Sequence, residues 1–244
     1  MKRIVSAREG SAVIVPAWIR TPLLALWAWM LRHPWSALAL IIAGLGIRVF
    51  GEMVDEFYEQ ELSPVDLRLQ AALQPYHAPA LDTAARLISD LLVLPWTALL
   101  IVPMLIGLLA QRREVAALVF LLVPAFTGLL VEMLKLLFGR ERPPTAIIDE
   151  IGHSFPSGHA TGSVVVYGLL GYLTARFLLR ARWARGIALA LAALMILLTG
   201  LARVYLHVHY PSDVAAGWGA GAIILAGAIL FLEAWERRAG SASP

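Results

Sequence analysis

Residues 115–138 read VAALVFLLVPAFTGLLVEMLKLLF, and Glu132 and Lys135 are the only charged side chains in this run. An α-helix needs about 20 predominantly apolar residues to cross the hydrocarbon core of a bilayer, so the run predicts a transmembrane helix. Similar stretches occur at 35–50, 84–110, 159–179, 184–202 and 214–235. We therefore expect an all-α fold, a bundle of six transmembrane helices.

The composition supports a membrane protein. Hydrophobic residues make up 59% of the chain and charged residues 15%, whereas an average soluble domain is about half apolar and a quarter charged. No polar stretch is long enough for a second soluble domain. We divide the chain into a cytoplasmic N-terminal segment (1–34), a membrane domain (35–235) and a cytoplasmic tail (236–244).

Two features of the composition exclude classes of function. The net charge of +3 is small and the basic residues are scattered, which argues against a nucleic-acid partner. The chain has no cysteine, which excludes disulfides, thiolate metal sites and a cysteine nucleophile. The sequence does not indicate an oligomeric state.

Residues 17–31 form a short apolar stretch ahead of the first span. The stretch contains Trp18, Trp27 and Trp29 and is interrupted by Arg20 and Pro22. Short length and tryptophans favour an interfacial helix on the membrane surface over a seventh span. The N-terminus does not resemble a cleaved signal peptide, and we expect residues 240–244 to be disordered.

The distribution of charge orients the six spans. Basic residues concentrate in the segments that share a side with the N-terminus, while the first loop on the other side is rich in acids. Because Lys and Arg gather in cytoplasmic loops, both termini are predicted to be cytoplasmic. Such a topology is that of a multi-pass membrane protein.

Three polar clusters interrupt the apolar pattern. One ends the third span, one opens the fourth, and one links the fifth to the sixth. Counting spans places all three at the same membrane face, and the charge rule makes that face the outer one. Their chemically informative members are Lys135, Arg142, Ser157, Gly158, His159, Arg203, His209 and Asp213.

These residue types form an anion pocket beside two histidines. Arginine forks match phosphate oxygens, lysine adds a point charge, and a helix N-terminus opening near Gly158 offers free N–H donors. Asp213 lies four residues after His209. In a helix this spacing would place both side chains on one face, but the intervening Pro211 favours a turn that enters the sixth span. The carboxylate would orient the imidazole for attack, and His159 would protonate the leaving group.

The three clusters resemble the signature of the type 2 phosphatidic acid phosphatase family, also called lipid phosphate phosphatases. Lys135 is followed after six residues by Arg142-Pro143, then comes Pro-Ser-Gly-His at 156–159, and then Arg203 with His209 and Asp213 at the family's spacing. The resemblance covers about 134–219 and the six-span layout. One departure is Ala202, where the family usually has a serine whose hydroxyl contacts phosphate.

The resemblance is to the bacterial membrane-embedded branch of this family, and it implies a six-span phosphatase of the bacterial inner membrane that forms a phosphohistidine on His209. It also implies His159 as the acid, Asp213 as the partner of His209, and Lys135, Arg142, Ser157, Gly158 and Arg203 as phosphate ligands. It implies no metal and no cofactor. The substrate would be a membrane lipid phosphate such as undecaprenyl diphosphate, phosphatidylglycerol phosphate or phosphatidic acid, entering sideways from the outer leaflet.

Two other functions use the same residues. A phosphotransferase would pass the phosphoryl group to another lipid, and a lipid transporter or binder would use the cations without chemistry. Spans broken at mid-membrane would favour a transporter.

Other polar residues have plainer interpretations. We interpret Arg140 as a solvated charge at the rim, and His33, His77, His153 and His207 as hydrogen-bonded surface residues. Glu132 is expected to pair with Lys135 on one helix, while Asp90 would line a pocket or a polar seam.

Overall fold

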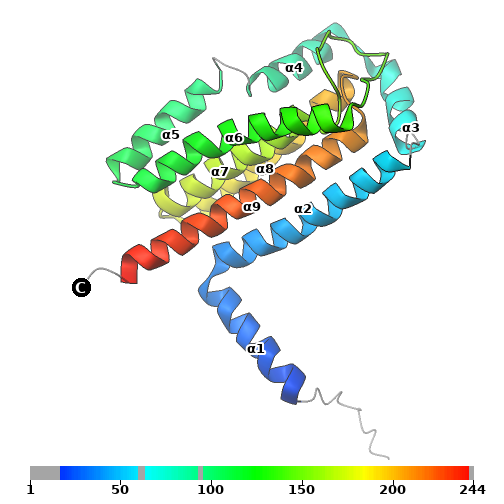
Figure 1. Ribbon diagram of the computed structural model, residues 1–244. Helices are drawn as coiled ribbons and strands as arrows, with labels where there is room; N and C mark the ends of the chain where they lie inside the picture. Colours follow the sequence, from blue (N-terminus) through cyan, green and yellow to red (C-terminus); the bar gives the residue numbers. More distant parts are fainter. Residues whose placement is uncertain (1–16, 60–63, 93–95, 242–244) are drawn as a thin grey trace, which may run out of the picture.

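The computed structural model describes residues 17–59, 64–92 and 96–241, and every regular element in these ranges is helical. The helices are α1 (Ala17–Arg32), α2 (Pro34–Tyr58), α3 (Pro64–Leu73), α4 (Pro79–Asp90), α5 (Ala98–Ala110), α6 (Glu114–Phe138), α7 (Gly158–Leu173), α8 (Arg182–Tyr205) and α9 (Pro211–Ser241). A 3₁₀ turn (Gln74–Tyr76) precedes α4, and a π-helical turn (Thr174–Leu178) extends α7. The predicted all-α bundle is confirmed (Figure 1).

Five helices are long and apolar enough to cross a membrane: α2, α6, α7 with its π-helical extension, α8 and α9. The predicted second span, 84–110, is not one continuous helix, because α4 ends at Asp90 and α5 begins at Ala98. The sequence has Pro95 between them, and proline lacks the N–H that a continuous helix requires. The prediction relied on the apolar character of the stretch as a whole, which does not reveal a break within it.

Helix α9 packs closely against two neighbours because of its glycines. A Cβ on Gly217 would lie 2.7 Å from the carbonyl oxygen of Ser157 on the N-terminal side of α7, and one on Gly221 would lie 2.8 Å from that of Thr161. On another face, a Cβ on Gly219 would lie 2.8 Å from the backbone nitrogen of Phe50 on α2. These distances leave no room for a side chain, so the glycines allow α9 to pack closely against α7 and α2.

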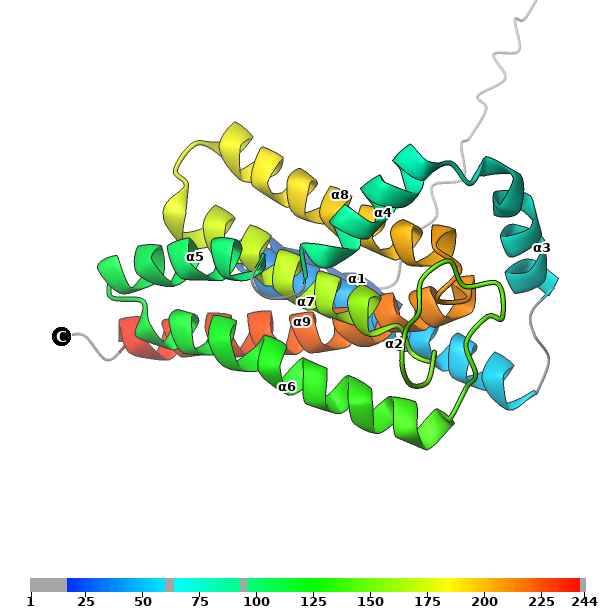
Figure 2. The same ribbon diagram turned by 90° about the horizontal axis from the view of Figure 1, so that it is seen from above.

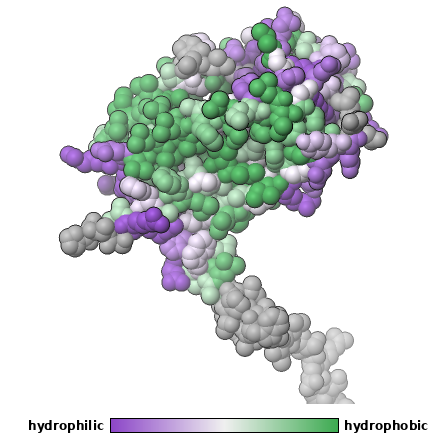
Figure 3. Space-filling model, in the orientation of Figure 1, coloured by the Kyte–Doolittle hydropathy of each residue, from purple (hydrophilic) through white to green (hydrophobic). Residues whose placement is uncertain are grey.

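The outer surface of the bundle is apolar. Large side chains such as Leu129, Leu136 and Leu137 on α6 are 62%, 76% and 72% exposed. Figure 3 shows a broad hydrophobic band on the face in view, with hydrophilic residues gathered at both ends of the bundle. A soluble monomer rarely exposes a contiguous apolar surface of this extent, so the band matches contact with lipid.

Helix α1 leaves the bundle at an angle to α2, and His33 separates the two helices (Figure 1). A helix over the predicted 17–31 stretch is therefore present, while its position relative to a bilayer remains a prediction. At the other end of the chain α9 continues to Ser241, so Gly240 and Ser241 are helical. The rest of the tail predicted to be disordered, 242–244, lies outside the described residues.

Candidate active site

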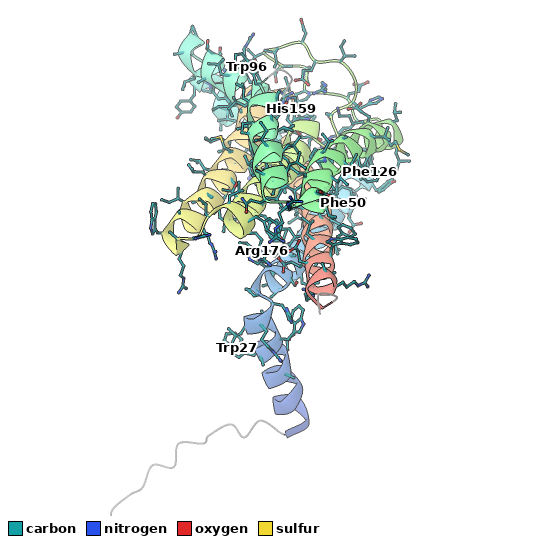
Figure 4. The ribbon with its side chains drawn as sticks, turned by 90° about the vertical axis from the view of Figure 1, so that its left-hand side faces the viewer. Trp27, Phe50, Trp96, Phe126, His159 and Arg176 are labelled. Carbon is teal, nitrogen blue, oxygen red and sulfur yellow. The ribbon has the colours of Figure 1, made fainter. Side chains whose placement is uncertain are left out.

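The three polar clusters meet at one end of the bundle. The loop between α6 and α7 crosses the end where α8 turns into α9, and α3 lies beside it (Figure 2). In Figure 4, His159 lies near this loop, whereas Arg176 lies toward the other end of the same helical segment. Counting spans had predicted this convergence.

A cavity of about 710 Å³ opens between α5, α6, α7 and the loop. One end of the cavity is polar and the remainder is apolar. The polar end is lined by Glu132, Lys135, Arg142, Glu150, His159 and His209. The apolar walls include Leu92, Ile101, Leu121, Pro124, Val131 and Val166. This shape fits a charged group joined to a hydrocarbon chain.

His209 lines the polar end of the cavity, and Asp213 lies beside it, outside the residues that line the cavity. His209 sits in the turn after α8, and Asp213 lies in the first turn of α9, which begins at Pro211. Their Nδ1 and Oδ2 atoms are 3.5 Å apart, and both side chains are buried. The separation is too long for a well-formed hydrogen bond, and Nδ1 of His209 has no hydrogen-bond partner among the described residues, but hydrogen bonds at catalytic pairs often tighten only when substrate binds.

The neighbours of His209 define its tautomer. Nη1 of Arg142 lies 3.3 Å from Nε2. A guanidinium has only donors, so Nε2 accepts and the ring proton resides on Nδ1, facing Asp213. Burial lowers the pKa of His209 below its ordinary value. Asp213 raises this pKa and the charges of Arg203 and Arg142 lower it, but burial is the largest effect. The imidazole is therefore neutral at physiological pH, and its Nε2 lone pair, which here accepts from Arg142, can attack a phosphate only after that contact is released.

The predicted phosphate ligands differ in their access to the cavity. Lys135, Arg142 and Gly158 line it, while Arg203 and Ser157 are buried behind it. Lys135 pairs with Glu132 at 2.8 Å, as expected. A Cβ on Gly158 would lie 3.7 Å from Nζ of Lys135, an ordinary van der Waals distance, so the start of α7 lies directly beside the ammonium.

Ser157 is the N-cap of α7 rather than a lining residue. Its Oγ accepts from the backbone nitrogen of Ala160 at 3.4 Å, and its own backbone nitrogen donates to the carbonyl of Asp213 at 3.0 Å. These bonds fix the start of α7 against the start of α9. The N–H groups of the first turn, beginning at Gly158, are the ones that face the cavity end of the helix.

Glu150, in the loop between α6 and α7, was missed by the sequence analysis. Its carboxylate forms ion pairs with both Arg203 and Arg142, the latter at 3.3 Å. Burial alone would raise the pKa of Glu150, but Arg203, His159 and Arg142 outweigh it and hold the pKa below its usual value. An anionic oxygen thus lies between two cations predicted to bind phosphate. The acidic pair at 149–150 between two motifs was the only signal for it in the sequence.

The rim interpretation of Arg140 was wrong. Its side chain is 14% exposed and forms ion pairs with Asp66 and Asp213. The surface interpretation was also wrong for His207, which is 2% exposed and packs on His77 with ring centroids 4.9 Å apart. Arg140 lies inside the first motif, between Lys135 and Arg142, and its position there gives no indication of its burial, because irregular loops have no periodicity.

Ala202 does not lie on the cavity wall. It is buried in an apolar cluster with Ala85, Leu206 and Val208. The hydroxyl that the family usually has at this position would enter that cluster in the present conformation.

Among the described residues no group of three or more His, Cys, Asp or Glu side chains is placed to hold a metal ion. The donors at the cavity are mainly cations and imidazoles, which suit an anion.

The fold and the site define a membrane-embedded helical bundle with a cationic, histidine-containing pocket at one end. Residues 116–237 match the family model of the PAP2 superfamily. The chain belongs to the PAP2 superfamily.

Curated relatives and a solved structure agree with this assignment. Phosphatidylglycerophosphatase B of Bacillus subtilis (strain 168) is 32% identical over 119 residues, which span 48% of this chain and 59% of that protein. Lipid A 1-phosphatase of Rhizobium johnstonii is 35% identical over 108 residues, 40% of each chain. The match thus spans less than two thirds of either curated relative.

The crystal structure of a transmembrane PAP2-type phosphatidylglycerolphosphate phosphatase from Bacillus subtilis superposes with a TM-score of 0.68. The two chains are 25% identical, and the superposition covers 79% of this chain and 96% of that one. Together with the five long apolar helices, the likeness supports a bacterial membrane protein.

Proposed function

We propose that this protein hydrolyses a phosphate group from a membrane lipid through a phosphohistidine intermediate on His209. The observation that supports it most is the cavity of about 710 Å³, which joins two histidines and two cations to a long apolar wall. A phosphorylated headgroup would occupy the polar end. The hydrocarbon chain would lie between α5, α6 and α7.

The proposed reaction has two steps. Nε2 of His209 attacks phosphorus while the bond to the lipid oxygen breaks, and His159 donates a proton to that oxygen. Water then attacks the phosphohistidine, His159 accepts a proton from the water, and inorganic phosphate and free His209 form. Asp213 stabilises the Nδ1–H of His209 in both steps.

Phosphate binding in this mechanism requires an exchange of anions. Glu150 now pairs with Arg142 and Arg203. A phosphate dianion would replace its carboxylate between the two guanidinium groups, with Lys135 as a third cation. Arginine forks hold phosphate oxygens in two-point contacts and stabilise the charge that develops in transfer.

We further propose that the site lies on the extracytoplasmic face and that the reaction requires no metal ion. The orientation rests on the basic residues at the other end of the bundle. The substrate candidates are phosphatidylglycerol phosphate, phosphatidic acid and undecaprenyl diphosphate, with lipid A 1-phosphate added because a relative bears that name.

Release of inorganic phosphate from this lipid panel by the purified protein tests the proposal. We expect release by the wild type with and without a chelator, and no release by His209→Ala. Activity that survives His209→Ala would contradict the nucleophile. Activity abolished by the chelator would contradict the metal-free mechanism, and a phosphorylated acceptor lipid in place of free phosphate would identify a transferase.

The interruption between α4 and α5 is the one observation that favours a second function, lipid transport or binding. Leu92 and Thr97 flank the interruption and line the cavity, and non-helical backbone at membrane depth is found where it lines a cavity. Binding of lipid phosphates without turnover by the wild type would favour this second function.

A further inference from the structure

Arg140 joins two buried carboxylates from distant parts of the chain. Its Nη1 donates to Oδ1 of Asp213 at 2.6 Å and to Oγ of Ser212 at 2.8 Å. Its Nη2 donates to Oδ2 of Asp66 at 3.1 Å. Arg140 is not among the residues that line the cavity, so its contacts are with the residues behind the site.

Asp66 connects helix α3 to the start of α9. The carboxylate is 1% exposed. It accepts from the backbone nitrogen of Ser212 at 2.9 Å and from Oγ of Ser212 at 2.5 Å, in addition to Arg140. A buried carboxylate is stable only when it is paired and hydrogen-bonded, and Asp66 meets both conditions. It therefore holds Arg140 and the first turn of α9 in one arrangement.

The two oxygens of Asp213 are fixed from opposite sides. Oδ1 accepts from Arg140, and Oδ2 accepts from the backbone nitrogen of Tyr210 at 2.9 Å. The Tyr210 ring lies under the guanidinium of Arg140, 4.4 Å from its central carbon. With both oxygens engaged, the carboxylate has one orientation, and Oδ2 faces Nδ1 of His209.

We propose that Arg140, held by Asp66, is a positioning residue that fixes the carboxylate of Asp213 and thereby the Nδ1–H tautomer of His209. The inference rests on the proposed function, because it assigns Arg140 to the same reaction. Arg140 acts through Asp213, whereas the cations that line the cavity or pair with Glu150 bind the phosphate.

The geometry requires an arginine. Two different nitrogens of one planar group reach Asp213 and Asp66. A lysine ammonium is a single point on a flexible stem and lacks this fork. A lysine at 140 would keep the positive charge beside Asp213 but would lose the simultaneous hold on both carboxylates.

Steady-state kinetics of Arg140→Lys, Arg140→Gln and Asp66→Asn test the inference, with Arg68→Gln as a matched control. Arg68 is an exposed cation on α3, the helix of Asp66. We expect kcat to fall about 10-fold to 100-fold in Arg140→Lys and more in Arg140→Gln, with KM within about 3-fold, because transition-state stabilisation alone is lost. Arg68→Gln should match the wild type.

A double-mutant cycle separates action through Asp213 from independent effects. Asp213→Asn alone should lower kcat by about 10³–10⁴-fold, as expected for loss of the group that orients a catalytic histidine. Adding Arg140→Gln to Asp213→Asn should then cost less than about 3-fold, because residues that act as a unit are not additive. A multiplicative loss would overturn the inference.

Folding is checked independently. Removing Arg140 leaves two buried carboxylates without their cation, so Arg140→Gln could lose activity because it folds poorly. Its unfolding and its kcat are therefore compared with those of the double variant Arg140→Gln/Asp66→Asn, which removes one charge of each sign. A folded double variant with restored kcat would overturn the inference, as would a rise in KM with unchanged kcat in Arg140→Lys. A wild type that releases no phosphate would instead contradict the proposed function itself.

Discussion

At the scale of single residues, the protonation of His209 determines how the site responds to pH. Burial lowers the pKa of His209 below the ordinary 6.5, and the neutral imidazole, which exists above this pKa, is the proposed nucleophile. We therefore expect the acid limb of the kcat/KM profile, where His209 becomes protonated, to lie below pH 6.5, whereas a loss of activity toward alkaline pH would report the proton that His159 must carry as the acid. The measurement is kcat/KM across the pH range, and an acid limb that begins above pH 6.5 would contradict the assignment.

Glu150 supplies a second prediction at this scale. Its carboxylate pairs with Arg142 and Arg203, so an incoming anion must compete with it. In Glu150→Gln the charge is removed at nearly constant size, and inorganic phosphate or vanadate should inhibit the enzyme at about 10-fold lower concentration, corresponding to about 1.4 kcal/mol. Glu52→Gln, at an exposed acid of α2 that does not line the cavity, is the control. Unchanged inhibition in Glu150→Gln would contradict this role.

The sequence predicted the residues with motif spacing and missed those that depend on loop conformation. Lys135, His159 and His209 were placed at one end because the parity of helical spans determines which ends meet. Glu150 and Arg140 lie in the irregular stretch between α6 and α7, where no periodicity relates position to burial. Their roles depend on long-range ion pairs that only the folded chain reveals.

At the scale of helices, the glycines of α9 make a stability prediction. A Cβ on Gly219 would lie 2.8 Å from the nitrogen of Phe50 and 3.0 Å from the carbonyl oxygen of Gly46. Gly219→Ala should lower the free energy of unfolding by about 1–3 kcal/mol through overpacking. Gly227, on the same helix, has no atom within 4 Å of a built Cβ, and Gly227→Ala should be neutral or stabilising by up to about 1 kcal/mol.

Unfolding in detergent, measured for both variants beside the wild type, checks this prediction. Equal stability of the two alanine variants would show that α2 and α9 do not approach as closely as described.

The same helices also show what hydropathy can and cannot predict. Long apolar runs gave α6 to within one residue, whereas the predicted span 214–235 fell short of α9 (Pro211–Ser241) at both ends. A local break such as the one after Asp90 depends on single residues that an average over the run conceals.

At the scale of the whole molecule, the proposed orientation can be read with single cysteines, since the chain has none of its own. Tyr76, between α3 and α4 at the active-site end, is 67% exposed, and Trp183, at the start of α8 at the opposite end, is 73% exposed. In intact cells a membrane-impermeant maleimide should label Tyr76→Cys and spare Trp183→Cys until the cells are lysed. The reverse pattern would place the site on the cytoplasmic face.

The central claim, phosphoryl transfer to His209 at the polar end of a lipid-sized cavity, is tested most directly by trapping the intermediate. Purified protein is mixed with a lipid whose phosphate is radiolabelled, quenched in alkali, which preserves phosphohistidine, and digested for mass spectrometry. The account predicts a phosphoryl group on the peptide that contains His209, present in the wild type and absent in His209→Ala. Label on another residue, or label and phosphate release that persist in His209→Ala, would contradict it.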